Sequence, residues 1–259
     1  MQGSVHLTGR IAFFALVFCS IAGQAQMAAF RDLTQGSRVP SEHLSIPTSC
    51  DKPDSSIADS PSPASNDAAG QSKSLELTIV QVSPAKLEIG NDFTASVRLK
   101  NVGNVAILIP AIADGEQLQP ASNPASEEKY EVGDVSFRLL SGKGKIAVYL
   151  DSSGALFADP DNKASYLELA PGKWLDIKTH ARVECGLENC AAEIHPDNKA
   201  VLTAWWYQRV LVHRVSGCAE THGSVKVREL DSAPFTVVVK NPAEHTGPAK
   251  TNFSSLAWK

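Results

Sequence analysis

The sequence predicts an all-β protein whose folded part is an immunoglobulin-like β-sandwich of about seven to nine strands. After residue 75, apolar and polar residues alternate with a period of two, which is typical of strands with one buried face. Gly, Pro and Asn separate these runs, and no segment shows a convincing 3.6-residue period. The predicted domain covers residues 75–240, which is long enough for one hydrophobic core.

Residues 1–25 are typical of a signal peptide. Arg10 supplies a positive flank, and residues 11–22 form an apolar run with no acidic residue before Asp32. The run is shorter than the roughly 20 residues of a membrane-spanning helix, and Gly23 and Ala25 provide small residues for cleavage. We therefore predict cleavage after Ala25 and an exported protein, periplasmic or extracellular, with no stable membrane span in its mature form.

Residues 26–74 are predicted to be a disordered linker. From residue 51 to 74 the chain is almost entirely Ser, Pro, Asp, Ala, Asn, Gly, Gln and Lys, a composition that buries too little apolar surface to become ordered. Residues 26–50 are less extreme, because Phe30, Leu33, Val39 and Leu44 are available to pack. A short helix or a docked arm remains an alternative there.

The first half of the domain contains three strand patterns. Residues 75–79 alternate, as do residues 93–99 after a Gly-Asn turn. Residues 105–109 form a short apolar strand that Pro110 ends. Residues 111–129 are polar and contain two prolines, so we expect a long surface loop.

The second half continues the pattern. Residues 135–139 and 146–150 alternate on either side of two glycines and predict a hairpin. A Pro-Gly turn then separates two further strands. The remaining predicted strands are residues 166–169, 175–183, 200–207, 210–215, 225–230 and 235–239. Residues 241–259 return to a polar composition and are predicted to be a flexible tail.

Residues 75–110 resemble the opening of immunoglobulin-like modules of bacterial secreted proteins. A strand, an Ile-Gly-Asn turn, a β-rich run and the sequence Lys-Asn-Val-Gly-Asn at residues 100–104 occur in that order. The Pro-Gly turn at residues 171–172 and the aromatic run at residues 204–207 are also similar. The resemblance is closest to CARDB adhesion-type modules and to the proteinase-inhibitor-like sandwich of bacilli. It implies a binding or spacing role without an identified active site, since fold alone does not determine function.

Export would place four cysteines in an oxidising compartment, where disulfides are expected. They are Cys50, Cys185, Cys190 and Cys218. Cys185 and Cys190 are close enough in sequence to bridge within one local loop, and we predict that pair. A zinc site that adds His195 is the weaker alternative, because the cysteine spacing is loose and no second cysteine pair matches it.

The sharpest candidate for metal chemistry is Cys218 with His213 and His222 nearby. Thiolate and imidazole are the ligands of blue-copper sites on β-sandwiches, and His180 is the only plausible distal donor. A disulfide or an ordinary loop cysteine is favoured over copper, so the sequence predicts no metal and no cofactor.

Two short loops contain oxygen donors that could be considered for calcium. They are Asp159, Asp161 and Asn162 in one loop and Asp197 and Asn198 in the other. Neither has the spaced carboxylates of an EF-hand, and these residue types commonly form turns. A role in turns is therefore the favoured interpretation.

Charge and motifs exclude several function classes. The formal charge is −4, or −5 once Arg10 is removed, and its scattered basic residues give no nucleic-acid footprint. No Gly-x-Ser-x-Gly, Ser-x-x-Lys or phosphate-binding glycine loop occurs, so we predict no enzyme activity. Trp205, Trp206 and Tyr207 alternate across a strand, so one face is expected in the core and the other partly exposed, and packing in the sandwich is favoured over contact with a sugar or a partner.

These observations predict an exported, non-enzymatic binding or accessory module of the cell envelope. Its partner would be a protein or an envelope component bound through loops or a strand edge. One alternative is a secreted proteinase inhibitor that acts through residues 111–129. The other is a copper-binding or redox β-sandwich that uses Cys218 and His222.

Overall fold

The computed structural model describes residues 27–40, 44, 74–113, 118, 127–140, 146–184 and 199–240. These residues form twelve strands and one short 3-10 helix, Lys163–Ser165, which confirms the all-β class. Within them, no helix has the length and apolar character needed to cross a membrane. The strands are β1 Met27–Asp32, β2 Leu75–Ser83, β3 Lys86–Glu88, β4 Asp92–Asn101, β5 Ile107–Pro110, β6 Glu127–Leu140, β7 Ile146–Ala158, β8 Tyr166–Leu169, β9 Trp174–Arg182, β10 Lys199–Ser216, β11 Ala219–Asp231 and β12 Phe235–Lys240.

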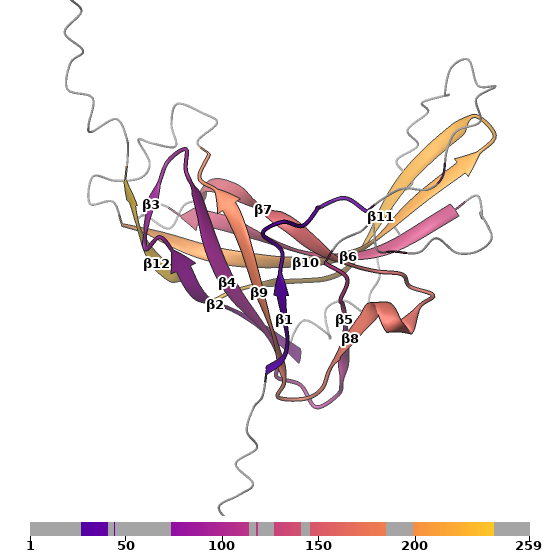
Figure 1. Cartoon of the computed structure of the whole chain (residues 1–259), viewed down its shortest axis with the longest axis horizontal. Coiled ribbons are helices and arrows are strands. Elements are labelled where there is room, and N and C mark those ends of the chain that lie inside the picture. Colours follow the sequence, from indigo (N-terminus) through magenta and orange to yellow (C-terminus); the bar gives the residue numbers. More distant parts are fainter. Residues whose placement is uncertain are drawn as a thin grey trace, which may run out of the picture.

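Ten of the strands form one large mixed sheet, and β5 and β8 form a separate two-stranded sheet (Figure 1). The main path runs β2-β4-β9-β7-β6-β10-β12-β3, with β1 added to β9 and β11 added to β10. A single bridge between Ser152 and Ala181 joins β7 to β9. The immunoglobulin-type sandwich expected from the sequence is therefore not clearly present, because this bridge joins into one sheet the strands that a sandwich would keep in two.

The main core lies between the strands on either side of that bridge. Phe93 on β4 and Phe137 on β6 meet edge to face, with ring centroids 5.5 Å apart. The alternation predicted for residues 93–99 is confirmed, since every second residue of β4 is buried. Burial of these apolar side chains supplies the main driving force for the fold.

Strand β10 is one 18-residue strand, whereas the sequence predicted two strands at residues 200–207 and 210–215. The buried face of β10 changes along its length. Leu202, Ala204 and Trp206 face the main core, whereas Leu211 packs on a second cluster on the opposite face. The apolar residues of β10 therefore move from one face of the strand to the other, although the pairing of β10 with β6 continues without a register shift.

The N-terminal residues 27–40 correct the linker prediction for residues 26–74. Strand β1 pairs in parallel with β9, and Leu33 is fully buried in the main core. Arg38 donates to the backbone carbonyl of Ser152 at 3.1 Å and forms ion pairs with Asp134 and Asp151. The physical reason is local: Leu33 supplies enough buried apolar surface to dock the segment.

Strand β2 begins at Leu75 and β12 ends at Lys240. The predicted signal peptide at residues 1–25, the composition-biased stretch at residues 51–73 and the predicted tail at residues 241–259 lie outside the described residues.

The buried carboxyl of Asp134 gives a prediction of pH dependence. Burial raises the pKa of Asp134 above its usual 3.8, and the charges of Arg38 and Arg209 only partly oppose this shift. Between 3.8 and the raised pKa, the folded chain binds more protons at this site than the unfolded chain, so stability falls as pH rises. We expect the free energy of unfolding of the wild type minus that of Asp134→Asn, both measured by urea denaturation, to fall as pH rises across that window. A difference that rises with pH would contradict the prediction.

Candidate functional site

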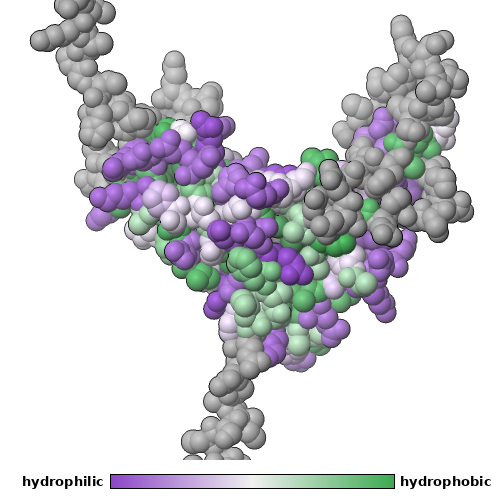
Figure 2. All heavy atoms as spheres, viewed as in Figure 1, coloured by the Kyte–Doolittle hydropathy of each residue, from purple (hydrophilic) through white to green (hydrophobic). Residues whose placement is uncertain are grey.

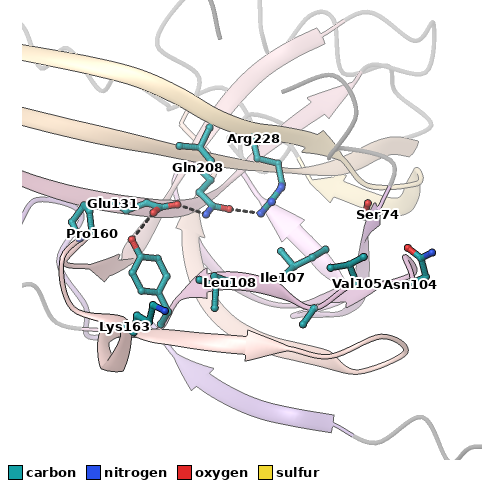
Figure 3. A pocket seen from close by; sticks show the side chains of 13 residues that line it. Ser74, Asn104, Val105, Ile107, Leu108, Glu131, Pro160, Lys163, Gln208 and Arg228 are labelled. Carbon is teal, nitrogen blue, oxygen red and sulfur yellow. Dashed lines mark hydrogen bonds between the residues drawn. The ribbon is translucent and has the colours of Figure 1, made fainter. Parts of the chain in front are cut away.

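The candidate site is a cavity of about 570 Å³ between the β5–β8 sheet and the strands β6, β10 and β11 (Figure 3). Its polar side is contributed by neighbouring strands of the large sheet, and its apolar side by the β5 segment. The lining residues are Ser74, Asn104, Val105, Ala106, Ile107, Leu108, Glu131, Pro160, Lys163, Tyr166, Gln208, Val227 and Arg228.

A chain of four polar side chains forms one wall of the cavity. The Tyr166 hydroxyl donates to Oε2 of Glu131 at 2.6 Å, and the Gln208 amide donates to Oε1 of the same carboxylate at 2.5 Å. Arg228 donates from Nη1 to Oε1 of Gln208 at 2.8 Å. Each carboxylate oxygen of Glu131 is therefore engaged, and the network connects β6, β8, β10 and β11.

Burial shifts the pKa values of two members of this network, Arg228 and Tyr166. Arg228 is only 5% exposed, and desolvation lowers its pKa, an effect that the charge of Glu131 partly offsets. Burial also raises the pKa of Tyr166, and its hydrogen bond to Glu131 and the charge of that carboxylate add to the shift. Tyr166 therefore remains a neutral donor at physiological pH, and Arg228 presents a partly desolvated positive charge to the cavity.

The opposite wall is apolar and follows from the pattern of β5. Ile107 and Ile109 are buried in the main core, so Leu108 between them points outward and is 46% exposed. Figure 3 shows Leu108 and Val105 across the cavity from Gln208 and Arg228. On the face drawn in Figure 2, hydrophobic side chains gather over the lower part of the molecule, where β1 and β5 lie.

The turn before β5 is held in place by Asn101. Its amide donates to the carbonyl oxygens of Val105 at 2.8 Å and Leu169 at 2.7 Å, and its side-chain oxygen accepts from the backbone of Gly103 at 2.9 Å. Asn101 is fully buried, so these bonds satisfy a polar group that would otherwise be costly to bury. They position the apolar wall relative to the large sheet.

The polar wall was missed by the sequence reasoning, although one signal was present. Gln208 continues the inward series Leu202, Ala204 and Trp206, so a polar residue occupies a core position of the alternation. Arg228 pairs with Gln208 across β10 and β11. Only the register between β6, β10 and β11 brings Glu131 and Arg228 next to Gln208 in the cavity wall.

The structure brings together two of the histidines considered for copper and adds a carboxylate. His213 and His222 are direct cross-strand partners in the β10–β11 hairpin, and both imidazoles contact Glu220. Cys218 lies in the turn of that hairpin and is disulfide-bonded. His180 lies on β9 opposite Thr94 of β4, in a different part of the sheet.

Cys218 is the only cysteine among the described residues, so Cys50 lies outside them. Cys185 and Cys190, the predicted pair, also lie outside them, as do His195, Asp197 and Asn198.

The first candidate calcium loop makes turn contacts. The Asp159 carboxylate accepts from the backbone of Asp161 at 2.9 Å, and the Asn162 side chain accepts from the backbone of Ala164 at 3.0 Å. Asn162 thereby caps the short helix Lys163–Ser165. These are the local backbone bonds that Asp and Asn typically make in turns.

The aromatic run on β10 divides between the two faces. Trp206 is fully buried, whereas Trp205 and Tyr207 lie on the opposite face and are partly exposed, with ring centroids 5.4 Å apart. The guanidinium of Arg138 lies over Trp205 and that of Arg209 over Tyr207. The exposed pair is therefore already covered in part by cations of this chain.

Two apolar residues of the predicted loop 111–129, Ile112 and Leu118, pack inward. Ile112 pairs with Phe157 of β7 and packs on the second cluster, in which Leu118 is buried. Residues 127–129 belong to β6. In these described positions the segment is anchored to the sheet.

No known protein family matches the sequence, and no curated protein is similar to it. Among solved structures, the chain is similar to Spo0M, a sporulation control protein from Bacillus subtilis, with 8% identity and a TM-score of 0.27 over 64% of this chain and 49% of that one. It is also similar to a β-glucosidase from Listeria innocua, with 14% identity and a TM-score of 0.24 over 64% of this chain and 16% of the enzyme.

The alkylpurine DNA glycosylase AlkC from Pseudomonas fluorescens is a third neighbour, with 14% identity and a TM-score of 0.21. The alignment covers 60% of this chain and 30% of the glycosylase. The chain thus spans about half the length of Spo0M and a smaller share of the two enzymes. With TM-scores of 0.27 or below, these diverse neighbours carry no argument about this chain, whose mostly-β structure with a large mixed sheet is described by its own strands.

Proposed function

We propose that this chain is an exported, non-enzymatic binding module of the cell envelope whose cavity takes a ligand with an apolar body and one anionic group. The signal-peptide pattern of residues 1–25 supports export. The observation that carries the choice of ligand is the pairing of a partly desolvated guanidinium, Arg228, with an exposed apolar wall at Leu108.

The charges of the cavity favour an anion. Arg228 and Lys163 are positive, and Glu131 is the negative lining residue, with both oxygens engaged by Tyr166 and Gln208. A carboxylate near Arg228 would replace part of the hydration that burial removes from the guanidinium. The cavity volume of about 570 Å³ is within the range of small-molecule sites.

Decanoate and decanol form a matched probe pair, because they share an apolar chain and differ in charge. We expect decanoate to bind at least tenfold more tightly in isothermal titration calorimetry, since a charged hydrogen bond contributes roughly 1.5–3 kcal/mol. Arg228→Met should remove that preference. Leu108→Asp should weaken binding of both probes without unfolding the chain, because Leu108 is 46% exposed.

Arg182→Met is the matched control, because Arg182 lies exposed on β9 and does not line the cavity. Equal affinity for decanoate and decanol, failure of both to bind, or equal loss in Arg182→Met and Arg228→Met would each contradict the proposal. The inhibitor alternative gains no support from the described part of residues 111–129, since Ile112 and Leu118 pack against the sheet.

A further inference from the structure

The β10–β11 hairpin places two histidines and one glutamate on the same face. Gly217 adopts a left-handed conformation, with φ of 62°, in the turn that pairs Ser216 with Ala219. From this turn the register makes His213 and His222 direct partners. Glu220 is two residues before His222 on β11, so its side chain lies on the same face.

The three side chains converge on a small volume. Oε1 of Glu220 lies 2.9 Å from Nε2 of His213 and 3.1 Å from Nε2 of His222. The imidazole rings stack nearly parallel, with centroids 4.6 Å apart and an interplanar angle of 5°. The potential ligand atoms all lie within 4.8 Å of one another.

Burial differs across the cluster in a way that suits an open metal site. The side chain of His213 is 4% exposed, that of Glu220 is 32% exposed, and that of His222 is 58% exposed. One ligand is thus anchored in the protein, and the other two border solvent. Three protein ligands with a side open to water are typical of metal sites that keep an exchangeable position.

A second carboxylate lies behind the anchored histidine. Oε2 of Glu128, on β6 opposite His213, is 4.0 Å from Nδ1 of that ring and accepts from the Tyr130 hydroxyl at 2.8 Å. Carboxylates near the second nitrogen of a ligating histidine commonly orient the ring. The Glu128 carboxylate therefore lies on the Nδ1 side of His213, at a distance longer than a hydrogen bond.

We propose that His213, Glu220 and His222 form a binding site for one divalent transition-metal ion, Cu²⁺ or Zn²⁺. Imidazole nitrogen suits both ions, and Cu²⁺ should bind more tightly by the Irving–Williams order. The carboxylate of Glu220 replaces Cys218 as the third candidate ligand, since the sulfur of Cys218 is held in a disulfide. The site lies outside the cavity lining and is independent of the ligand proposed for that cavity.

The test is a metal titration of the mature, untagged protein. Native mass spectrometry and calorimetry with Cu²⁺ and with Zn²⁺ should each show one equivalent bound. Glu220→Gln and His222→Ala should each weaken binding of both ions at least tenfold. His180→Ala is the matched control, because it removes a histidine on β9, and it should bind as the wild type does.

Electron paramagnetic resonance of the Cu²⁺ form provides a second readout, in which hyperfine coupling from two imidazole nitrogens is expected. His222 is mostly exposed, so its substitution should not unfold the chain, and thermal melting without metal checks this. The proposal is overturned if the wild type binds no stoichiometric metal, or if Glu220→Gln and His222→Ala bind as tightly as His180→Ala. Binding that requires reduced Cys218 and produces a thiolate charge-transfer band would also overturn it.

Discussion

Gly133→Ala is expected to lower the free energy of unfolding by about 3 kcal/mol or more, the upper end of the usual cost of overpacking a core. A Cβ atom at Gly133 would lie well inside van der Waals contact of two ring carbons of Trp206. Trp206 is fully buried between β6 and its core neighbours, so its rigid indole has no space into which it can move. Urea denaturation followed by intrinsic fluorescence measures the effect.

Two controls separate this clash from the general effect of replacing glycine. Gly223 lies in β11, where an added Cβ would meet only Val212 at 4.0 Å, so Gly223→Ala should be neutral or slightly stabilising. In a Trp206→Leu background, which removes the indole, most of the cost of Gly133→Ala should disappear. A cost that persists in that background would contradict the steric explanation.

Leu33→Ala should destabilise the chain by about 2–5 kcal/mol and release the N-terminal arm, residues 27–40. Leu33 is fully buried in the main core, and its backbone N–H donates to the carbonyl of Lys178 at 2.7 Å. Loss of the side chain leaves a cavity under an arm that is otherwise held by its pairing with β9 and by polar contacts such as those of Arg38. Limited proteolysis should cut the arm earlier, and urea denaturation should show the lower stability.

Gly154→Ala, on β7, tests the packing of the N-terminal arm against the sheet at Leu33. Its Cβ would lie 2.8 Å from the carbonyl oxygen of Leu33 and 3.1 Å from Cα of Gly36, so the arm must shift. We expect faster cleavage of the arm in this variant as well. Val39→Ala is the matched control, because Val39 is 64% exposed, and it should leave cleavage unchanged. If Leu33→Ala and Val39→Ala are cleaved at the same rate, the arm is not held by Leu33.

The sequence predicted the elements whose buried face stays constant. β4 alternates through Phe93 and Leu99 without interruption, and its burial follows that alternation. β10 was predicted as two strands, whereas in the structure it is one strand whose buried face changes after Gln208. A period-two pattern reports which face is buried, so it fails where a second core takes over on the opposite side.

The sequence also predicted only part of the candidate metal site. The sequence pointed to His213 and His222 because imidazoles close in sequence suggest a metal, but it supplied Cys218 as their partner. Only the hairpin register reveals that Glu220 is the group that both imidazoles contact.

The sequence by itself determined the all-β class and the positions of most strands, because these depend on local alternation and turn residues. The tertiary structure decided the docking of the N-terminal arm, the single ten-stranded sheet and the meeting of Glu131 with Arg228 in the cavity. These features depend on strand order and register between segments far apart in the chain, which the pattern within one strand does not contain.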